Sequence, residues 1–257
     1  MKWDAVQYDS VKAPQVDAGR ELIALANVKQ NDSVLDIGCG TGKLTLEISR
    51  LASQGTVLGI DPSAEMLRKA EELSGARDNM RFMLLTGQSM EFADQFDLVF
   101  SNSALQWIQE QREVAGLVYR SLKKGGRIAF QLPAKDFCRE FFDYTSAVIT
   151  LLGYEKYFRN WQKPWYLPTK EEYEVLLKDT GFININVCSR DYRLVFGSVG
   201  DVIAWWSSAG LRPFLALLPA REQEYFKDAV AMSYESNRTD RGIEFDFRRL
   251  FAFAEKA

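Results

Sequence analysis

The chain has 257 residues, of which 47% are hydrophobic and 26% are charged, a balance typical of a folded globular protein. Its 32 basic and 35 acidic residues give a net charge of −3, which argues against nucleic acid as a partner, because phosphate contacts require a basic surface. No apolar run approaches the ~20 residues needed to cross a bilayer, so we expect no membrane partner.

The positions of the cysteines and the absence of histidine limit the reactions and the metal sites that we expect. Cys39, Cys138 and Cys188 are spaced too widely for a zinc knuckle or a disulfide framework, and Asp4 stands where a signal peptide would continue into an apolar region. These features predict a cytoplasmic protein. The chain contains no histidine, which excludes Ser-His-Asp and Cys-His catalysis and removes the commonest metal ligand. We therefore expect no metal site.

Short apolar runs and helical patterns alternate along the first half of the chain. The glycine pair Gly125-Gly126 is expected to end the last of these helices. Strands separated by helices of this length predict parallel pairing and an open, doubly wound sheet. The predicted strands are 34–37, 56–60, 81–85, 96–100 and 127–132, and the predicted helices include 44–51, 63–73 and 114–122.

After Pro133 the composition changes, because 24 of the 33 aromatic residues follow from Phe137 onward. Helices are predicted at 135–151, at 170–179 behind a capping box that starts at Thr169, and over most of 199–236. The alternation in 182–196 predicts a strand, and a switch of parity predicts a bulge near 189–191. The final segment, 243–254, is expected to be a strand with one buried face.

The strongest chemical signal is the run Val34-Leu35-Asp36-Ile37-Gly38-Cys39-Gly40-Thr41-Gly42. A strand leads into three alternate glycines and then into a helix, which allows the backbone to approach a ligand beside free amides. Asp61 follows the next strand, 19 residues beyond Gly42, where dinucleotide folds place a carboxylate that binds ribose. The purely structural alternative is a tight turn, with Asp61 as a helix cap.

Two departures distinguish this loop from a nicotinamide or flavin site. The spacing is G-x-G-x-G, not G-x-G-x-x-G, and Lys43 occupies the third fingerprint position. The carboxylate of Asp36 also stands two residues before the first glycine, where it would repel a pyrophosphate. It would instead favour a ligand that carries an ammonium and a sulfonium. S-adenosylmethionine has both groups as well as a ribose. Among the functions considered for this loop, a dehydrogenase is therefore the least favoured.

With these motifs the sequence resembles the class I S-adenosylmethionine-dependent methyltransferases across nearly the whole chain. The resemblance rests on 35–42, 59–63, 87–92, 96–102 and 122–126. It implies that Asp36 lines the methionine end, that Asp61 holds the ribose and that Gln88 flanks adenine, although many relatives carry an acid at this last position. The full implied cofactor set is Asp36, Gly38, Cys39, Gly40, Asp61, Pro62, Met66, Gln88, Ser89, Ser101 and Asn102.

The residues after Asn102 bear on the methyl acceptor. Enzymes that methylate amide or adenine nitrogens usually place two prolines and an aromatic residue here, and this chain does not. The stretch 101–107 resembles instead the trans-aconitate methyltransferase group and its small-acid relatives. Segments 209–214 and 246–251 and the pattern Trp3-Asp4-x-x-x-Tyr8 look like signatures of the same group.

A carboxylate acceptor also suits a chain without histidine. A carboxylic acid with a pKa of ~4 is ionised at neutral pH, so its oxygen attacks a methyl group without a general base. We therefore predict O-methylation of a small (poly)carboxylic acid, with S-adenosylhomocysteine as the second product. The alternatives are C- or O-methylation of an apolar natural product, and a protein that binds S-adenosylmethionine without turning it over.

No catalytic residue can be assigned, but four side chains are candidates for acceptor binding: Arg212, Trp107, Arg249 and Tyr8. A guanidinium can bind a carboxylate through two parallel hydrogen bonds. Trp107 follows a strand at the edge where open α/β sheets bind ligands. Each has a structural alternative: a helix cap for Arg212, a sheet ion pair for Arg249, and simple packing for the two aromatic residues.

The expected architecture is a single α/β methyltransferase domain, 1–257, with a Rossmann-like, doubly wound, mostly parallel seven-stranded sheet. Residues 1–133 would form the cofactor-binding core, and 182–196 and 243–254 would be the final strands. The helical insertions 134–168 and 198–240 would form a lid over the carboxyl edge of the sheet. The expected partner is a small-molecule acceptor, and the expected assembly is a monomer or a homodimer.

Overall fold

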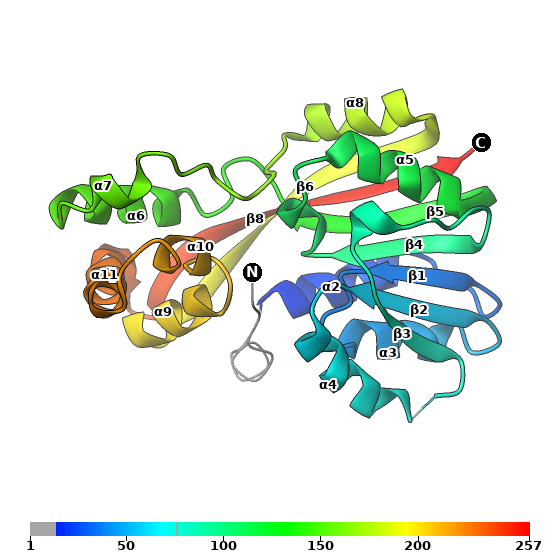
Figure 1. Ribbon diagram of the computed structural model, residues 1–257, viewed down its shortest axis with the longest axis horizontal. Coiled ribbons are helices and arrows are strands. Elements are labelled where there is room, and N and C mark those ends of the chain that lie inside the picture. The colour runs from blue at the N-terminus through cyan, green and yellow to red at the C-terminus, as the bar shows by residue number, and fades with distance from the viewer. Residues whose placement is uncertain (1–13, 76) are drawn as a thin grey trace.

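The computed structural model describes residues 14–75 and 77–257, and within them the chain forms one mixed sheet (Figure 1). The strand order is β3-β2-β1-β4-β5-β8-β6, with the first five strands parallel and β8 antiparallel to both neighbours. This confirms the predicted Rossmann-like sheet, to which a two-residue strand, β7, adds at the start of β8. The strands are β1 (Ser33–Ile37), β2 (Thr56–Asp61), β3 (Met80–Leu84), β4 (Phe96–Asn102), β5 (Leu122–Pro133), β6 (Phe182–Phe196), β7 (Arg238–Thr239) and β8 (Gly242–Lys256).

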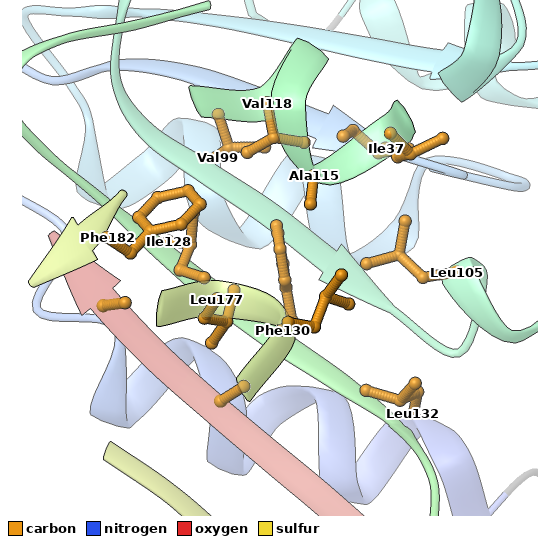
Figure 2. Packing of buried hydrophobic residues seen from close by; sticks show 14 of the residues in the cluster. Ile37, Val99, Leu105, Ala115, Val118, Ile128, Phe130, Leu132, Leu177 and Phe182 are labelled. Atoms are coloured by element: carbon orange, nitrogen blue, oxygen red, sulfur yellow. The ribbon is translucent and has the colours of Figure 1, made fainter. Parts of the chain in front are cut away.

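Helices cover both faces of the parallel part of the sheet. On one face α5 (Gln111–Ser121) and α8 (Lys170–Thr180) bury apolar side chains against β1, β4, β5 and β8. Figure 2 shows this layer, in which Phe130 of β5 lies between Leu177 of α8 and Ala115 of α5. On the other face α2 (Pro14–Leu25) and α3 (Lys43–Leu51) form a second cluster, and α4 (Ala64–Ser74) packs beside α3 and β3.

Strands β6 and β8 continue past the other strands and carry a helical lobe, which lies beyond the carboxyl ends of the parallel strands (Figure 1). The lobe has its own core of buried aromatic side chains, including Phe141, Trp206, Phe214 and Phe245. Its helices are α6 (Arg139–Leu151), α7 (Glu155–Phe158), α9 (Val199–Ser208), α10 (Arg212–Leu215) and α11 (Ala220–Ser233). Helix α6 begins four residues later than predicted.

Local signals place several helix ends as expected. The Ser63 hydroxyl accepts a hydrogen bond from the Met66 amide at 3.3 Å and so caps α4. At α8, the Glu172 amide donates to the Thr169 hydroxyl at 3.1 Å and the Thr169 amide donates to the Glu172 carboxylate at 2.8 Å, which completes the predicted capping box. No helix in residues 14–75 or 77–257 combines the length and apolar character that a membrane crossing requires.

The prediction that Gly125-Gly126 ends the preceding helix is wrong. Helix α5 ends at Ser121, and Leu122 is already extended and fully buried as the first residue of β5. The glycine pair lies within β5, where its pairing with β4 shifts register between Phe96 and Leu98. Gly125 has a φ of +72°, a conformation that glycine adopts readily, so the pair accommodates an irregular strand instead of capping a helix.

The predicted bulge near 189–191 is also wrong. Residues 186–196 pair with β8 in unbroken register, and the shift lies between Ile183 and Asn186. The parity of the buried residues changes for another reason, which is that the covering elements change sides. Val187 packs in the cluster formed with α5 and α8, whereas Leu194 points to the opposite face and packs in the helical lobe.

The same change of side affects β8. Ile243, Phe245 and Phe247 pack in the lobe as one face, but on the other face only Asp246 is exposed and Glu244 is buried, so the predicted single buried face is wrong for most of the strand. From Arg249 to Ala252 the strand is buried on both faces, because it passes between the two helical layers of the core.

Candidate active site

The glycine loop joins β1 to α3 at the carboxyl edge of the sheet. Gly38, Gly40 and Gly42 all have positive φ, at +73°, +55° and +78°, a region that residues with a Cβ rarely adopt. A Cβ on Gly38 would lie 2.1 Å from the Cβ of Ala104, so this glycine is needed for packing within the protein. A Cβ on Gly40 would meet no atom of residues 14–75 or 77–257 within 4 Å, so this part of the structure leaves the backbone open to a ligand.

Asp61, the last residue of β2, is bound to this loop. Its Oδ2 accepts a hydrogen bond from the Gly40 amide at 3.0 Å, and its Oδ1 accepts one from the Ser63 amide at 2.8 Å. Burial raises the pKa of the carboxyl, and these two hydrogen bonds oppose the shift. The contacts fix the carboxylate beside the open backbone of Gly40, where the sequence motif predicted a ribose.

Asp36 lies deeper, within β1. Its side chain is buried, and the Thr45 hydroxyl of α3 donates to its Oδ2 at 2.6 Å. Burial raises the pKa of this carboxyl to about 7, the Thr45 hydrogen bond lowers it and the charge of Asp61 raises it further. A cationic ligand at this edge would favour the ionised form. Two acids beside an open glycine backbone therefore fit a positively charged nucleoside.

Three more residues of the predicted cofactor set surround the loop. Cys39 is half-buried, and burial together with the charges of Asp36 and Asp61 raises the pKa of its thiol, so the thiol is neutral. Pro62 is exposed between β2 and α4, and Met66 is buried in the first turn of α4. The structure thus brings all three to the edge formed by β1 and β2.

Gln88 and Ser89 lie on a short 3-10 helix, η1 (Gly87–Ser89), after β3. The Gln88 amide donates to the Glu110 carboxylate at 3.1 Å, and the hydroxyls of Ser89 and Thr86 share a hydrogen bond at 2.8 Å. Glu110 was not singled out in the sequence, because 22 residues separate it from Gln88. It nevertheless supplies an acid near the position where many relatives carry one.

The last two predicted cofactor residues end β4. Ser101 is fully buried, and its hydroxyl donates to the Ile37 carbonyl at 2.8 Å, which ties β4 to β1 just before the glycine loop. Asn102 is half-buried, and a Cβ on Gly19 of α2 would lie 2.9 Å from its amide nitrogen. Gly19 was missed by sequence reasoning, since nothing near it marks a close approach.

A cavity of about 90 Å³ lies between the carboxyl ends of β4 and β5 and the helical lobe. Most of its wall is aromatic. Its described lining residues are Ser103, Gln106, Trp107, Pro133, Phe137, Phe141, Phe142, Trp165, Leu167, Trp205, Trp206, Ala209, Gly210, Phe247 and Arg249. The volume is several times what one water molecule needs, so the cavity suits a small molecule.

Arg249 of β8 supplies the charge in this cavity. The residue is 2% exposed, and its Nη2 donates to the Ser103 hydroxyl at 2.6 Å and to the Gln131 side-chain oxygen. The guanidinium carbon lies 5.0 Å from the centre of the Phe247 ring and 5.6 Å from that of Phe137. Arg249 has the same parity in β8 as the buried residues Phe247 and Phe251, so its burial follows from the alternation of the strand.

The other acceptor-binding candidates are distributed differently. Trp107 lines the cavity, with its ring centre 5.8 Å from that of Trp165. Arg212 begins α10 and is half-buried, and it is not among the described lining residues. Tyr8 lies outside the described residues.

One short segment connects the cavity with the glycine loop. The 3-10 helix η2 (Leu105–Trp107) follows β4, and Ala104 just before it packs against Gly38. Ser103 and Gln106, on either side, line the cavity. A molecule held in the cavity would therefore lie next to a ligand held by the loop, which is the arrangement that group transfer requires.

Comparison with known proteins agrees with this geometry. A family model described as "Methyltransferase domain" matches residues 28–189. A trans-aconitate 2-methyltransferase of Deinococcus radiodurans is 30% identical over 100% of this chain and 99% of its own length, and one of Azoarcus sp. is 27% identical over 98% and 95%.

Among solved structures, phosphoethanolamine N-methyltransferase 2 of Haemonchus contortus, in complex with S-adenosylhomocysteine, has the same fold. Its TM-score is 0.61 at 21% identity, over 93% of this chain and 52% of that one. The family match covers more than half of the present chain, and the glycine loop that it includes fits the methyl donor. This chain is an enzyme that belongs to the class I S-adenosylmethionine-dependent methyltransferases.

Proposed function

We propose that the enzyme transfers a methyl group to a carboxylate oxygen of a small carboxylic acid and so forms a methyl ester. The observation that carries this proposal is the buried guanidinium of Arg249 in the wall of the cavity. A guanidinium is the side chain best suited to bind a carboxylate, because its planar donors match the two oxygens. The names of the Deinococcus and Azoarcus relatives make trans-aconitate the first acid to test.

In this proposal the glycine loop, Asp36 and Asp61 hold S-adenosylmethionine, which supplies a methyl group on a positively charged sulfur. The open backbone of Gly40 admits the ligand, and Asp61 accepts hydrogen bonds from a ribose. The helical lobe acts as a lid over this edge and excludes water, which strengthens the contact between Arg249 and the acceptor.

The protein needs to position the acceptor but not to deprotonate it, because a carboxylic acid is already ionised at neutral pH. Among the described residues, the Ser103 hydroxyl and the Gln131 side-chain oxygen accept hydrogen bonds from Arg249. These groups orient the guanidinium in the cavity. Orientation of the acceptor against the methyl group then provides the acceleration, which for well-oriented reactants reaches ~7–11 kcal/mol.

The second candidate is C- or O-methylation of an apolar natural product, and the aromatic wall of the cavity favours it. Trp165 and Trp206 from the lobe line the cavity together with Phe137 and Phe247. Such an acceptor has no carboxylate, so its methylation would not depend on Arg249.

A radiolabelled methyl-transfer assay on a panel of acids, phenols and uncharged terpenoids separates the two candidates. We expect label to enter at least one acid as an ester, which mild base hydrolyses to release labelled methanol. Base-stable label in phenols or terpenoids, with none in acids, would contradict the ester proposal and support the second candidate.

A further inference from the structure

We infer that the acceptor is a monocarboxylic acid with an apolar, aromatic or aliphatic body, and that polycarboxylic acids are the poorer substrates. This inference rests on the proposed function and adds the class of acid. It depends on how charge and aromatic surface are distributed around the cavity.

The charge and the aromatic surface are unequally represented in the described wall of the cavity. Among the described residues that line it, Arg249 is the only charged one, and eight of the others are aromatic. The face of an aromatic ring carries negative potential, so it repels a carboxylate. A second or third carboxylate in this cavity would lose its hydration without gaining a counter-ion, which is costly in a site of low polarity.

The lobe carries further cations, of which Lys163 and Arg212 are two examples, and neither of these is among the described lining residues. The Lys163 ammonium is exposed and lies 4.9 Å from the centre of the Phe142 ring. Arg212 begins α10, two residues beyond the lining residue Gly210. A polycarboxylate that had one group on Arg249 would therefore place its other charges against aromatic rings.

The polarity of the cavity also orients the ligand. Arg249 is held at the sheet end, where its partners Ser103 and Gln131 belong to the ends of β4 and β5. The opposite wall comes from the lobe, where Phe141 and Trp206 stack with their ring centres 3.8 Å apart. A carboxylate on Arg249 thus lies toward the glycine loop, and an apolar body extends toward the lobe.

The first test measures kcat/KM for phenylacetate, cinnamate and octanoate against trans-aconitate, citrate and succinate. Tryptophan fluorescence gives a second readout, because four of the six tryptophans line the cavity and a bound ligand changes their emission. We expect kcat/KM to be at least about tenfold higher for the best apolar monoacid, with matching fluorescence changes.

The outcomes distinguish the inference from the function on which it rests. Preference for a polycarboxylate overturns the inference and leaves ester formation in place. Methylation of no acid overturns both. A preference for apolar monoacids that appears in kcat/KM and in the fluorescence titration supports both.

A variant pair tests the charge argument directly. Leu167 is a half-buried lining residue, so Leu167→Lys adds a second cation to the cavity. The control Val175→Lys adds the same charge on the exposed side of α8. We expect Leu167→Lys to shift the ratio of kcat/KM toward succinate by about tenfold and the control to leave it unchanged. An equal ratio in two folded variants, checked by thermal melting, would contradict the inference.

Discussion

The guanidinium of Arg249 donates to the hydroxyl of Ser103 at 2.6 Å and so joins β8 to the loop that follows β4. Ser103 has a positive φ of 57°, and its amide donates to the Gln131 carbonyl at 2.8 Å. The next residue, Ala104, packs against Gly38 of the glycine loop. The aromatic cavity and the glycine loop are therefore held together by consecutive residues.

This relationship predicts that Arg249 and Arg212 respond differently to substitution. Arg249→Lys keeps a positive charge but loses the planar pair of donors, so we expect KM for the acceptor acid to rise about 10- to 100-fold. Arg212→Lys is the matched control, because Arg212 is not among the described lining residues, and it should change KM by less than about twofold.

Steady-state kinetics measures both effects, and calorimetry with S-adenosylhomocysteine checks that donor binding is preserved. A larger rise of KM in Arg212→Lys than in Arg249→Lys would show that the acceptor carboxylate binds to Arg212 and not to Arg249.

We expect substitution of Gly38 to lower the stability of the protein and substitution of Gly40 to lower its affinity for the donor. Gly38→Ala places a Cβ against Ala104 in addition to the ~1–2 kcal/mol cost of a left-handed conformation, so it should unfold at a lower denaturant concentration than Gly40→Ala. The methyl group of Gly40→Ala meets no atom in the described part of the chain, so this variant should stay folded, but the methyl group would block the ligand's approach to the backbone.

We therefore expect calorimetry to show an affinity for S-adenosylhomocysteine in Gly40→Ala that is lower by about tenfold or more. Unchanged affinity in this variant would show that the ligand does not contact the loop at Gly40.

Asp36 predicts a pH dependence of donor binding. Its pKa of about 7 in the free protein means that the carboxyl is mostly protonated at pH 6 and mostly ionised at pH 8. A cationic donor favours the ionised form, so the affinity for S-adenosylmethionine should rise about tenfold from pH 6 to pH 8. Calorimetry at the two pH values, on the wild type and Asp36→Asn, measures this. The exposed control Asp78→Asn should keep the full dependence, whereas a persistent rise in Asp36→Asn would assign it to another group.

The same carboxyl predicts the opposite trend in the stability of the unliganded protein. Its folded-state pKa lies above the ordinary pKa of 3.8 for an aspartate, so the folded state binds more protons than the unfolded state between pH 4 and pH 7. Stability is therefore fully present below pH 4 and is lost as the pH rises through 7, by roughly 4 kcal/mol at most. Chemical denaturation at pH 5 and pH 8 should show a smaller difference between the two pH values in Asp36→Asn than in the wild type. Equal differences in the two proteins would mean that the pKa of Asp36 is not raised in the folded protein.

Much of the cofactor half was predictable because its information is local. The strand, the alternate glycines and Asp36 lie within nine consecutive residues, and Asp61 follows the next strand at a characteristic distance. Parallel strands bring their carboxyl ends to one edge, so this order alone places both acids together. The hydrogen bond from Gly40 to Asp61 confirms that arrangement.

The second half of the chain was predictable only in part. Periodicity in a sequence indicates which residues are buried, but it does not indicate which helix packs on them or which side chains they contact. The parity switch in β6 was correctly detected and wrongly attributed to a bulge, since the covering layer changes sides along an unbroken strand. In the same way, the burial of Arg249 follows from its parity in β8. Parity does not indicate that Arg249 lines the cavity, nor that Arg212 is not among its described lining residues.

The alternating α/β order, the glycine loop and its two acids could be inferred without a structure, because each depends on residues close together in the chain. The contact of Arg249 with Ser103, 146 residues away, in an aromatic cavity became visible only in the folded chain. This contact depends on the register of β5, β8 and β6, which is set by long-range pairing and brings distant side chains to one end of the sheet.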